Sequence, residues 1–188
     1  MRVSKQKVGE HRDAILVAAS RLFRARGFDK VGVAEVTQAA GLTHGGFYGH
    51  FASKEALAAE VCDLSFGNAV RRVQASASLE DYIDYYASTE HRDREGPCPM
   101  VALGTDVSRL SGPVRAHFSA GVARYVAALR AFMPEDDKLA EGRASALVSI
   151  LVGGLSLARA LAASDPALSE SILDGVRAQA KGLVKTHA

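Results

Sequence analysis

The sequence of 188 residues contains only two cysteines and five prolines, and aromatic residues make up 6% of it. The cysteines, Cys62 and Cys98, are far apart and form no CxxC pair, so a reducing cytoplasm is the expected setting. The chain also has no HExxH metal motif, no GxSxG nucleophile motif and no glycine-rich phosphate loop after a strand. We therefore expect no metal, no cofactor and no enzymatic activity.

Long hydrophobic runs are absent as well. The longest stretch without a charged residue or a histidine is the one between Arg143 and Arg159, and it contains several serines and glycines. A membrane-spanning helix needs about 20 mostly apolar residues, so this stretch is predicted to be a buried helix of a soluble protein. No apolar secretory segment follows Met1. These absences predict a cytoplasmic protein without a membrane partner.

The chain does have ample material for a folded core and an uneven distribution of charge. Hydrophobic residues make up 48% of the sequence and charged residues 23%. Residues 1–55 hold nine Lys/Arg and five Asp/Glu, whereas the rest holds 14 basic and 16 acidic residues, for a net charge of +2. A basic first third on a slightly acidic remainder is typical of a nucleic-acid-binding head on a neutral body.

Apolar residues recur at helical spacing along the whole chain, and strand-like alternation is scarce. Glycine or proline separates most of the segments, as at Gly27, Gly41 and Pro113. The spacing predicts an all-α fold of about nine helices. The first contains Ile15 to Phe23 and stops at Gly27, and the others have the approximate ranges 34–40, 44–50, 53–70, 79–90, 100–110, 114–133, 139–163 and 168–184.

Two of the predicted helices are short and are separated by a tight turn. Gly41 lies between them, and Thr43 is suited to cap the second one. Two short helices around such a turn, within a basic segment, indicate a helix-turn-helix whose second helix lies in the major groove of DNA. Gly45, Gly46 and Gly49 crowd that second helix. They either let the backbone approach DNA closely or are merely tolerated, and the sequence leaves both interpretations open.

The run from Val33 to Leu57, VAEVTQAAGLTHGGFYGHFASKEAL, resembles the signature of the TetR/AcrR family of transcriptional regulators. Ala18 to Phe23, together with Gly27 and Phe28, is similar to the family's first helix. The resemblance implies a three-helix DNA-binding head over residues 1–52, with its motif at about 32–51. A helical ligand-binding and dimerisation body over residues 53–188 would follow.

The resemblance also implies roles for single residues of the head. His44 is the best candidate for a base-edge contact, Lys54 for a phosphate contact and Thr37 for a backbone contact from the supporting helix. The full predicted DNA-binding set is Thr37, Thr43, His44, Gly45, Gly46, Tyr48, His50 and Lys54.

In the body, the resemblance implies a homodimer built by the last two long helices and a small-molecule cavity between the middle helices. Gly153 and Gly154 would allow the helices to approach closely, and His117 or Arg109 would be a polar handle for the ligand. The predicted interface is Leu147, Ile150, Leu151, Gly154, Leu155, Leu161, Ile172 and Val176. The predicted cavity lining is Phe66, Tyr82, Tyr86, Met100, Arg109, His117, Phe118 and Tyr125.

These features predict a DNA-binding repressor that a small, partly apolar effector releases from a pseudo-palindromic operator on double-stranded DNA. The alternative is a helical protein-interaction or redox-sensing regulator that acts through Cys98. That role requires an exposed thiol of low pKa.

Overall fold

The computed structural model describes residues 5–94, 96, 98–110 and 112–185, without the side chains of Lys5 and His44. Within these ranges the chain is helical and has no strand, so the predicted all-α class is confirmed. The elements are α1 (Lys5–Arg26), α2 (Val33–Ala39), the 3-10 turn η1 (His44–Gly46), α3 (Lys54–Gln74), α4 (Leu79–Tyr86), α5 (Thr89–Asp93), α6 (Pro99–Arg109), α7 (Pro113–Arg130), α8 (Ala140–Leu161) and α9 (Pro166–Lys185).

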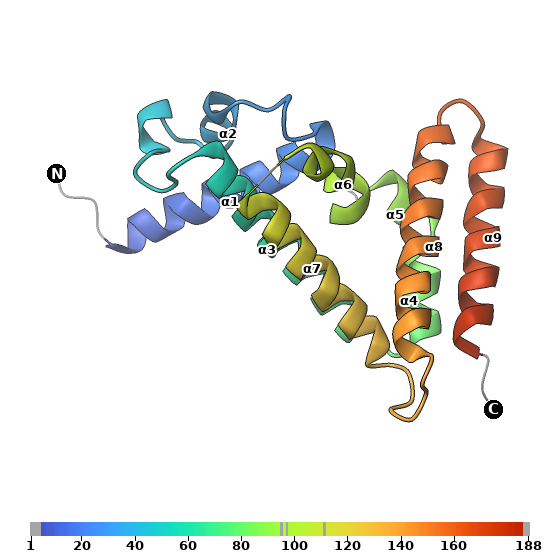
Figure 1. Cartoon of the computed structure of the whole chain (residues 1–188). Helices are drawn as coiled ribbons and strands as arrows, with labels where there is room; N and C mark the ends of the chain where they lie inside the picture. The colour runs from blue at the N-terminus through green and yellow to red at the C-terminus, as the bar shows by residue number, and fades with distance from the viewer. Residues whose placement is uncertain (1–4, 95, 97, 111, 186–188) are drawn as a thin grey trace.

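The first helices form a small head at one end of the molecule (Figure 1). Helix α1 ends where Gly27 takes a φ of +86°, and α2 is followed by Gly41 with a φ of +73°. Both are left-handed conformations that glycine adopts at little cost. The head closes around side chains that are buried completely or almost so: Ile15, Ala19, Phe23, Val36, Phe47 and Phe51.

The predicted helix over residues 44–50 is wrong in its length. Only His44–Gly46 forms a single 3-10 turn, and further turns follow up to His50. The backbone hydrogen bonds that remain are isolated ones, such as Gly46 N to Thr43 O at 2.9 Å and Phe51 N to Phe47 O at 3.0 Å. Each glycine costs about 0.8–1 kcal/mol relative to alanine in a helix, so the three glycines explain why a regular α-helix does not form.

Helix α3 leads from the head into the body and lies alongside α7 over most of its length (Figure 1). Its start is fixed by Ser53, whose hydroxyl accepts a hydrogen bond of 3.1 Å from the backbone N–H of Ala56. This cap was expected from the sequence. Another expectation was wrong, because the helix predicted over residues 79–90 is interrupted. Helix α4 ends at Tyr86, and Ser88 caps the separate α5 by accepting from the N–H of His91 at 3.0 Å.

Helices α8 and α9 form an antiparallel hairpin at the far side of the body (Figure 1). Helix α8 is long and apolar enough to cross a membrane by length and composition, with a mean hydropathy of 1.7 in its most apolar window. One such helix is weak evidence for a membrane protein. In this fold α8 packs against α7 and α9, and it buries Leu147, Leu151 and Leu155 there.

Candidate DNA-binding surface and cavity

The turn that follows α2 presents its polar and small residues to solvent. Thr43 and Gly45 are exposed, Gly46 and His50 are half-buried, and Tyr48 is 64% exposed. The Tyr48 ring stands edge-on to Phe47 at 5.1 Å between centroids, and Phe47 itself is fully buried. Phe47 and Phe51 therefore anchor the turn from inside, as expected, while Tyr48 points outward. The predicted base contact by the His44 side chain lies outside the described part of the chain.

Thr37 is placed differently from expectation, whereas Lys54 makes an additional contact inside the head. Thr37 is only 1% exposed, and its hydroxyl donates to the carbonyl oxygens of Val33 and Ala34 at 3.1 and 2.9 Å. It therefore stabilises α2 and is not presented to a DNA backbone. The ammonium of Lys54 lies 4.1 Å from the centroid of the Phe28 ring, a cation–π contact that ties the start of α3 to the end of α1.

Other charged side chains hold the head together. Arg12 pairs with Glu60 on α3 and lies over the Phe51 ring, and Arg26 pairs with Glu35 on α2. These pairs are partly or largely exposed, so each contributes about 0–1 kcal/mol at most. They nevertheless engage two of the basic side chains of the N-terminal segment internally, and these two cations are therefore less suited to contact DNA.

A cavity of about 560 Å³ lies where the head meets the body. Its walls come from α1, α3, α4, α5 and the start of α6. Three tyrosines of α4, Tyr82, Tyr85 and Tyr86, form an aromatic side. The remaining lining residues are Arg24, Ser65, Asn68, Ala69, Arg71, Arg72, Ala75, His91, Arg94, Gly96, Cys98 and Pro99.

Of the predicted cavity residues, the structure places only Tyr82 and Tyr86 in this wall. Phe66 and Tyr125 are fully buried in the core, Phe118 packs edge-on against Phe66, and Met100 is buried in α6. The two predicted polar handles also lie elsewhere. His117 pairs with Asp63 at 2.6 Å on the outside of the α3–α7 pair, and Arg109 is the last residue of α6.

His91 is the buried basic group of the cavity wall. Its Nδ1 donates to the carbonyl oxygen of Tyr86 at 2.8 Å, and its ring stacks on Tyr85 at 4.9 Å. Burial is the main cause that lowers the pKa of His91, and the positive charges of Arg94, Arg72 and Arg159 lower it further. His91 is therefore held as a neutral imidazole in a positively charged environment.

Cys98 lies in the same wall but lacks the properties of a sensor thiol. It is 5% exposed, and burial raises its pKa. Cys62 is also buried, and burial together with the charge of Asp63 raises its pKa to about 11. A reactive cysteine needs an accessible thiolate, and neither residue provides one in this conformation. In this conformation the redox alternative lacks the accessible thiolate that it requires.

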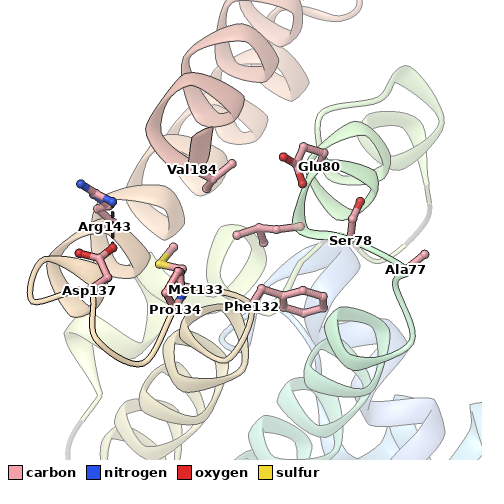
Figure 2. A pocket seen from close by; sticks show the side chains of 10 residues that line it. Ala77, Ser78, Glu80, Phe132, Met133, Pro134, Asp137, Arg143 and Val184 are labelled. Atoms are coloured by element: carbon pink, nitrogen blue, oxygen red, sulfur yellow. Dashed lines mark hydrogen bonds and ion pairs between the residues drawn. The ribbon is translucent and has the colours of Figure 1, made fainter. Parts of the chain in front are cut away.

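A second hollow, of about 310 Å³, lies at the opposite end of the body, where α4 begins near the loop between α7 and α8. Figure 2 shows Arg143 and Asp137 joined on one side of it, at 2.8 Å, with Met133 and Phe132 beside them. Since its arginine and aspartate already satisfy each other, this hollow offers a ligand fewer unused polar groups than the arginine-rich cavity.

The head and the cavity are physically connected. Arg24, on α1, lines the cavity and donates to the carbonyl oxygen of Gly96 at 3.0 Å. A second connection joins the backbone N–H of Phe28 to the carboxylate of Asp106 on α6 at 2.7 Å. The first helix of the head is thus also a wall of the cavity. The sequence showed no sign of this, because Arg24 has the spacing of an ordinary surface residue.

Comparison with known proteins shows which regulators this chain is similar to. The model of the family described as bacterial regulatory proteins, tetR family, matches residues 15–61, which are the head and the start of α3. AcrR of Shigella flexneri, an HTH-type transcriptional regulator, is 40% identical over 67 residues, which are 36% of this chain and 31% of that protein. Residues 15–61 are thus a TetR-type DNA-binding head, and the chain resembles the TetR/AcrR family.

Other TetR/AcrR relatives agree with this assignment. The HTH-type transcriptional repressor DhaR of Mycobacterium sp. strain GP1 is 31% identical over 113 residues, which are 55% of this chain and 56% of that protein. The matches with both curated relatives thus span less than two thirds of their lengths. Crystal structures of E. coli NemR in its reduced form and of a TetR regulator from Chloroflexus aurantiacus share the fold over 95% and 97% of this chain. They cover 98% of each of those chains, with TM-scores of 0.77 and 0.78 at 22% and 20% identity.

Within this TetR/AcrR fold, half of the predicted dimer residues face the chain's own core. Leu147, Leu151 and Leu155 are at most 1% exposed, and Gly154 is buried against Val176 of the same chain. Ile150, Leu161, Ile172 and Val176 are half-buried. The sequence prediction identified the apolar face of α8 correctly, but this face packs on α9 and the body.

The outward face of the α8–α9 hairpin is built differently. On α8 it consists of small residues at helical spacing, namely Gly142, Ser145, Ser149, Gly153, Ser156 and Ala160. Gly175 and Ala178 extend the exposed small surface on α9, and the large apolar side chains Leu157 and Leu168 are 58% and 47% exposed. Of this face, sequence reasoning had singled out only Gly153, because it sought mainly large apolar residues.

Proposed function

We propose that this chain is a homodimeric transcriptional repressor in the cytoplasm that binds a pseudo-palindromic DNA operator and releases it when a small molecule occupies the cavity. The observation that carries the DNA-binding part is the exposed turn of residues 43–50, anchored by Phe47 and Phe51 at the position of a TetR-type helix-turn-helix. The observation that supports effector control is the position of Arg24, which belongs to both the head and the cavity wall.

DNA binding is tested with the purified full chain and fragments of its parent genome, from which the bound sequences are selected. A symmetric dimer predicts two half-sites whose centres are about 34–36 Å apart, or further when the spacing is longer. Replacing the exposed Tyr48 with Ala should weaken binding by about tenfold or more, since each base or phosphate contact contributes about 1–3 kcal/mol. Phe132→Ala is the matched control, because Phe132 is also an exposed aromatic residue but lies at the far end of the body. Selection of no recurrent sequence, or equal effects of both variants, would contradict the proposal.

The position of Lys54 allows a test of phosphate binding separate from stability. Lys54→Met keeps the aliphatic stem against Phe28 and removes only the charge. If Lys54 binds a phosphate in the complex, the slope of log affinity against log salt concentration falls by about one unit. If its charge acts only on the Phe28 ring, the variant melts at a lower temperature and the salt slope does not change.

We assign dimerisation to the outward face of α8 and α9, where a second copy would form a four-helix bundle through the same surface. Gly153→Arg places a long charged side chain in the middle of this face without any clash inside the chain, because nothing lies within 4 Å of a Cβ built there. The control is Ala127→Arg on the exposed side of α7. Light scattering should find monomers for Gly153→Arg and dimers for Ala127→Arg, and a dimeric Gly153→Arg would contradict the assignment.

A further inference from the structure

The cavity between head and body is lined by cations in a chain that is close to neutral overall. Four arginines, Arg24, Arg71, Arg72 and Arg94, border it together with His91. No Asp or Glu occurs among the described residues that line it. The whole chain carries 23 basic and 21 acidic residues, so this one-sided lining is a local property and not a consequence of composition.

We propose that the effector of this regulator is a small organic acid with a planar aromatic body, held by its oxyanion to Arg72 and Arg94 and by its ring to the tyrosines of α4. The inference rests on the proposed function, which it deepens by naming the chemical class of the effector. An arginine binds a carboxylate through charge-assisted and often bidentate hydrogen bonds. The cavity, of about 560 Å³, lies within the usual range for such ligands.

The donors of Arg72 and Arg94 are largely unused in the described structure. The guanidinium of Arg72 lies over the Tyr85 ring at 4.7 Å and donates no hydrogen bond to any described residue. Arg94 donates to the Tyr85 hydroxyl alone among them, at a long 3.3 Å. Tyr85 thus holds both cations at one side of the cavity while their N–H groups remain available to an anion.

The hydroxyl of Tyr86 supplies an independent observation. It is buried, and it is the one buried side-chain oxygen or nitrogen among the described residues that has no hydrogen-bond partner of ordinary geometry. The Cys98 thiol is close enough to affect the pKa of the Tyr86 hydroxyl but forms no hydrogen bond of ordinary geometry with it. A buried hydroxyl without a partner is costly, and Tyr86 is one of the residues that line the cavity, so a polar ligand atom that hydrogen-bonds to this hydroxyl would offset that cost.

Other classes of ligand fit less well. A cation would be repelled by the arginines, and a wholly apolar molecule would cover the Arg72 guanidinium and the Tyr86 hydroxyl without giving either a hydrogen bond. The rings of Tyr82, Tyr85 and Tyr86 favour a flat molecule, since offset and edge-on ring contacts are the preferred aromatic packing. An aromatic acid has both an oxyanion that accepts hydrogen bonds from Arg72 and Tyr86 and a flat ring that packs on the tyrosines.

The test uses three probes of the same shape and different charge: 2-naphthoate, 2-naphthamide and 2-naphthylmethylammonium. Calorimetric titration of the full-length protein should find the anion bound about tenfold more tightly than the amide or better, as expected when charge-assisted hydrogen bonds are added, and no detectable binding of the cation. Equal affinities for the three probes, or no binding of naphthoate at millimolar concentration, would overturn the proposal.

Variants assign the binding to this site. Arg72→Met and Arg94→Met should each weaken naphthoate binding and leave the weaker binding of the amide nearly unchanged. Arg115→Met is the matched control, because Arg115 is exposed on α7 and does not line the cavity. Equal losses in all three variants would show that only the general charge of the protein attracts the anion, and would overturn the proposal.

DNA binding is measured separately so that the two proposals fail in different ways. Naphthoate should lower the affinity of the wild-type protein for its selected DNA and should have no such effect on Arg72→Met. If the protein binds DNA but not the anion, the effector class is wrong and the regulator stands. If it binds the anion in the cavity but no DNA, the proposed function fails, but the proposal that the cavity binds an aromatic acid stands.

Discussion

Arg24 on the first helix of the head donates a hydrogen bond of 3.0 Å to the carbonyl oxygen of Gly96 in the body. Gly96 has a φ of +74°, and a Cβ at this position would lie 3.2 Å from the Arg24 guanidinium. The positive φ favours glycine there, and the close approach of Arg24 leaves little room for a side chain. This contact joins the DNA-binding element to the segment before α6, beside the cavity, and it gives the first prediction.

Arg24→Met should uncouple the head from the cavity. The variant keeps the aliphatic packing and loses hydrogen bonds from a charged donor, which typically contribute about 1.5–3 kcal/mol each. We expect DNA binding without effector to persist and the effector-induced loss of DNA affinity to shrink. Anisotropy titrations of labelled DNA, with and without 2-naphthoate, measure both quantities. An undiminished effector response in Arg24→Met would rule out this route of coupling.

The glycines of the DNA-facing turn predict opposite changes in stability and binding. Nothing in the chain lies within 4 Å of a Cβ built on Gly45 or Gly46, and neither glycine has a positive φ. Gly46→Ala should therefore raise the free energy of unfolding by about 0.5–1 kcal/mol. Since the fold does not need these glycines, we expect close approach to DNA to need them, and the same variant should bind DNA more weakly. Denaturant unfolding and DNA titration provide the two values, and stronger DNA binding would exclude the close-approach interpretation.

Gly154 should tolerate no side chain, because a Cβ there would overlap Val176 on α9. Overpacking of this kind costs about 1–3 kcal/mol, so Gly154→Ala should unfold at a lower denaturant concentration. The double variant Gly154→Ala, Val176→Ala should recover part of the loss. Gly9→Ala on the exposed side of α1 is the control and should not be destabilised. The comparison is made at one protomer concentration, and a Gly154→Ala variant of wild-type stability would contradict the α8–α9 packing.

His91 should make the protein less stable in mild acid. Its pKa in the folded chain lies below the ordinary histidine value of 6.5, mainly because of burial. Between 6.5 and the lower folded pKa the unfolded chain binds more protons, so the free energy of unfolding falls as the pH is lowered through this window. His91→Asn retains a donor for the Tyr86 carbonyl and cannot titrate, so its stability should fall less over the same window. If the free energies of unfolding of the two proteins fell equally over this window, His91 would not contribute to the pH dependence of stability.

The two thiols should react slowly in the folded protein. Burial raises the pKa of both Cys62 and Cys98, which leaves little thiolate at neutral pH. Mass spectrometry after brief alkylation should find neither residue modified in buffer and both modified in denaturant. Rapid modification of Cys98 in the folded state, with loss of DNA binding, would restore the redox alternative.

Local sequence patterns were sufficient for most of the fold. Glycine at positions 27 and 41, the Ser53 cap and the helical spacing of apolar residues are signals within a few residues, and each predicted its element correctly. The failures also have local physical causes, which the spacing of apolar residues alone does not show. Ser88 caps the separate helix α5, so that α4 ends before it. The glycines prevent a regular α-helix over residues 44–50.

The site was harder to predict than the fold. Tyr82 and Tyr86 lie in the cavity wall as expected, but Arg24 on α1, Arg72 on α3, and His91 and Arg94 on α5 and its C-cap come together only through the packing of three separate helices. His117, the expected polar handle, instead finds Asp63, which is 54 residues away in sequence. Nothing local in a sequence specifies such pairings, since they depend on how the helices dock.

The shared use of α1 also bears on how this protein can change over time. A head that contributes a wall to the cavity is not an interchangeable module. Transplanting residues 1–52 from another regulator would exchange the operator preference and, in the same step, remove Arg24 from the cavity. New operator preference is therefore expected to arise by point changes in the exposed turn of residues 43–50, which leave α1 intact, and not by exchange of whole domains.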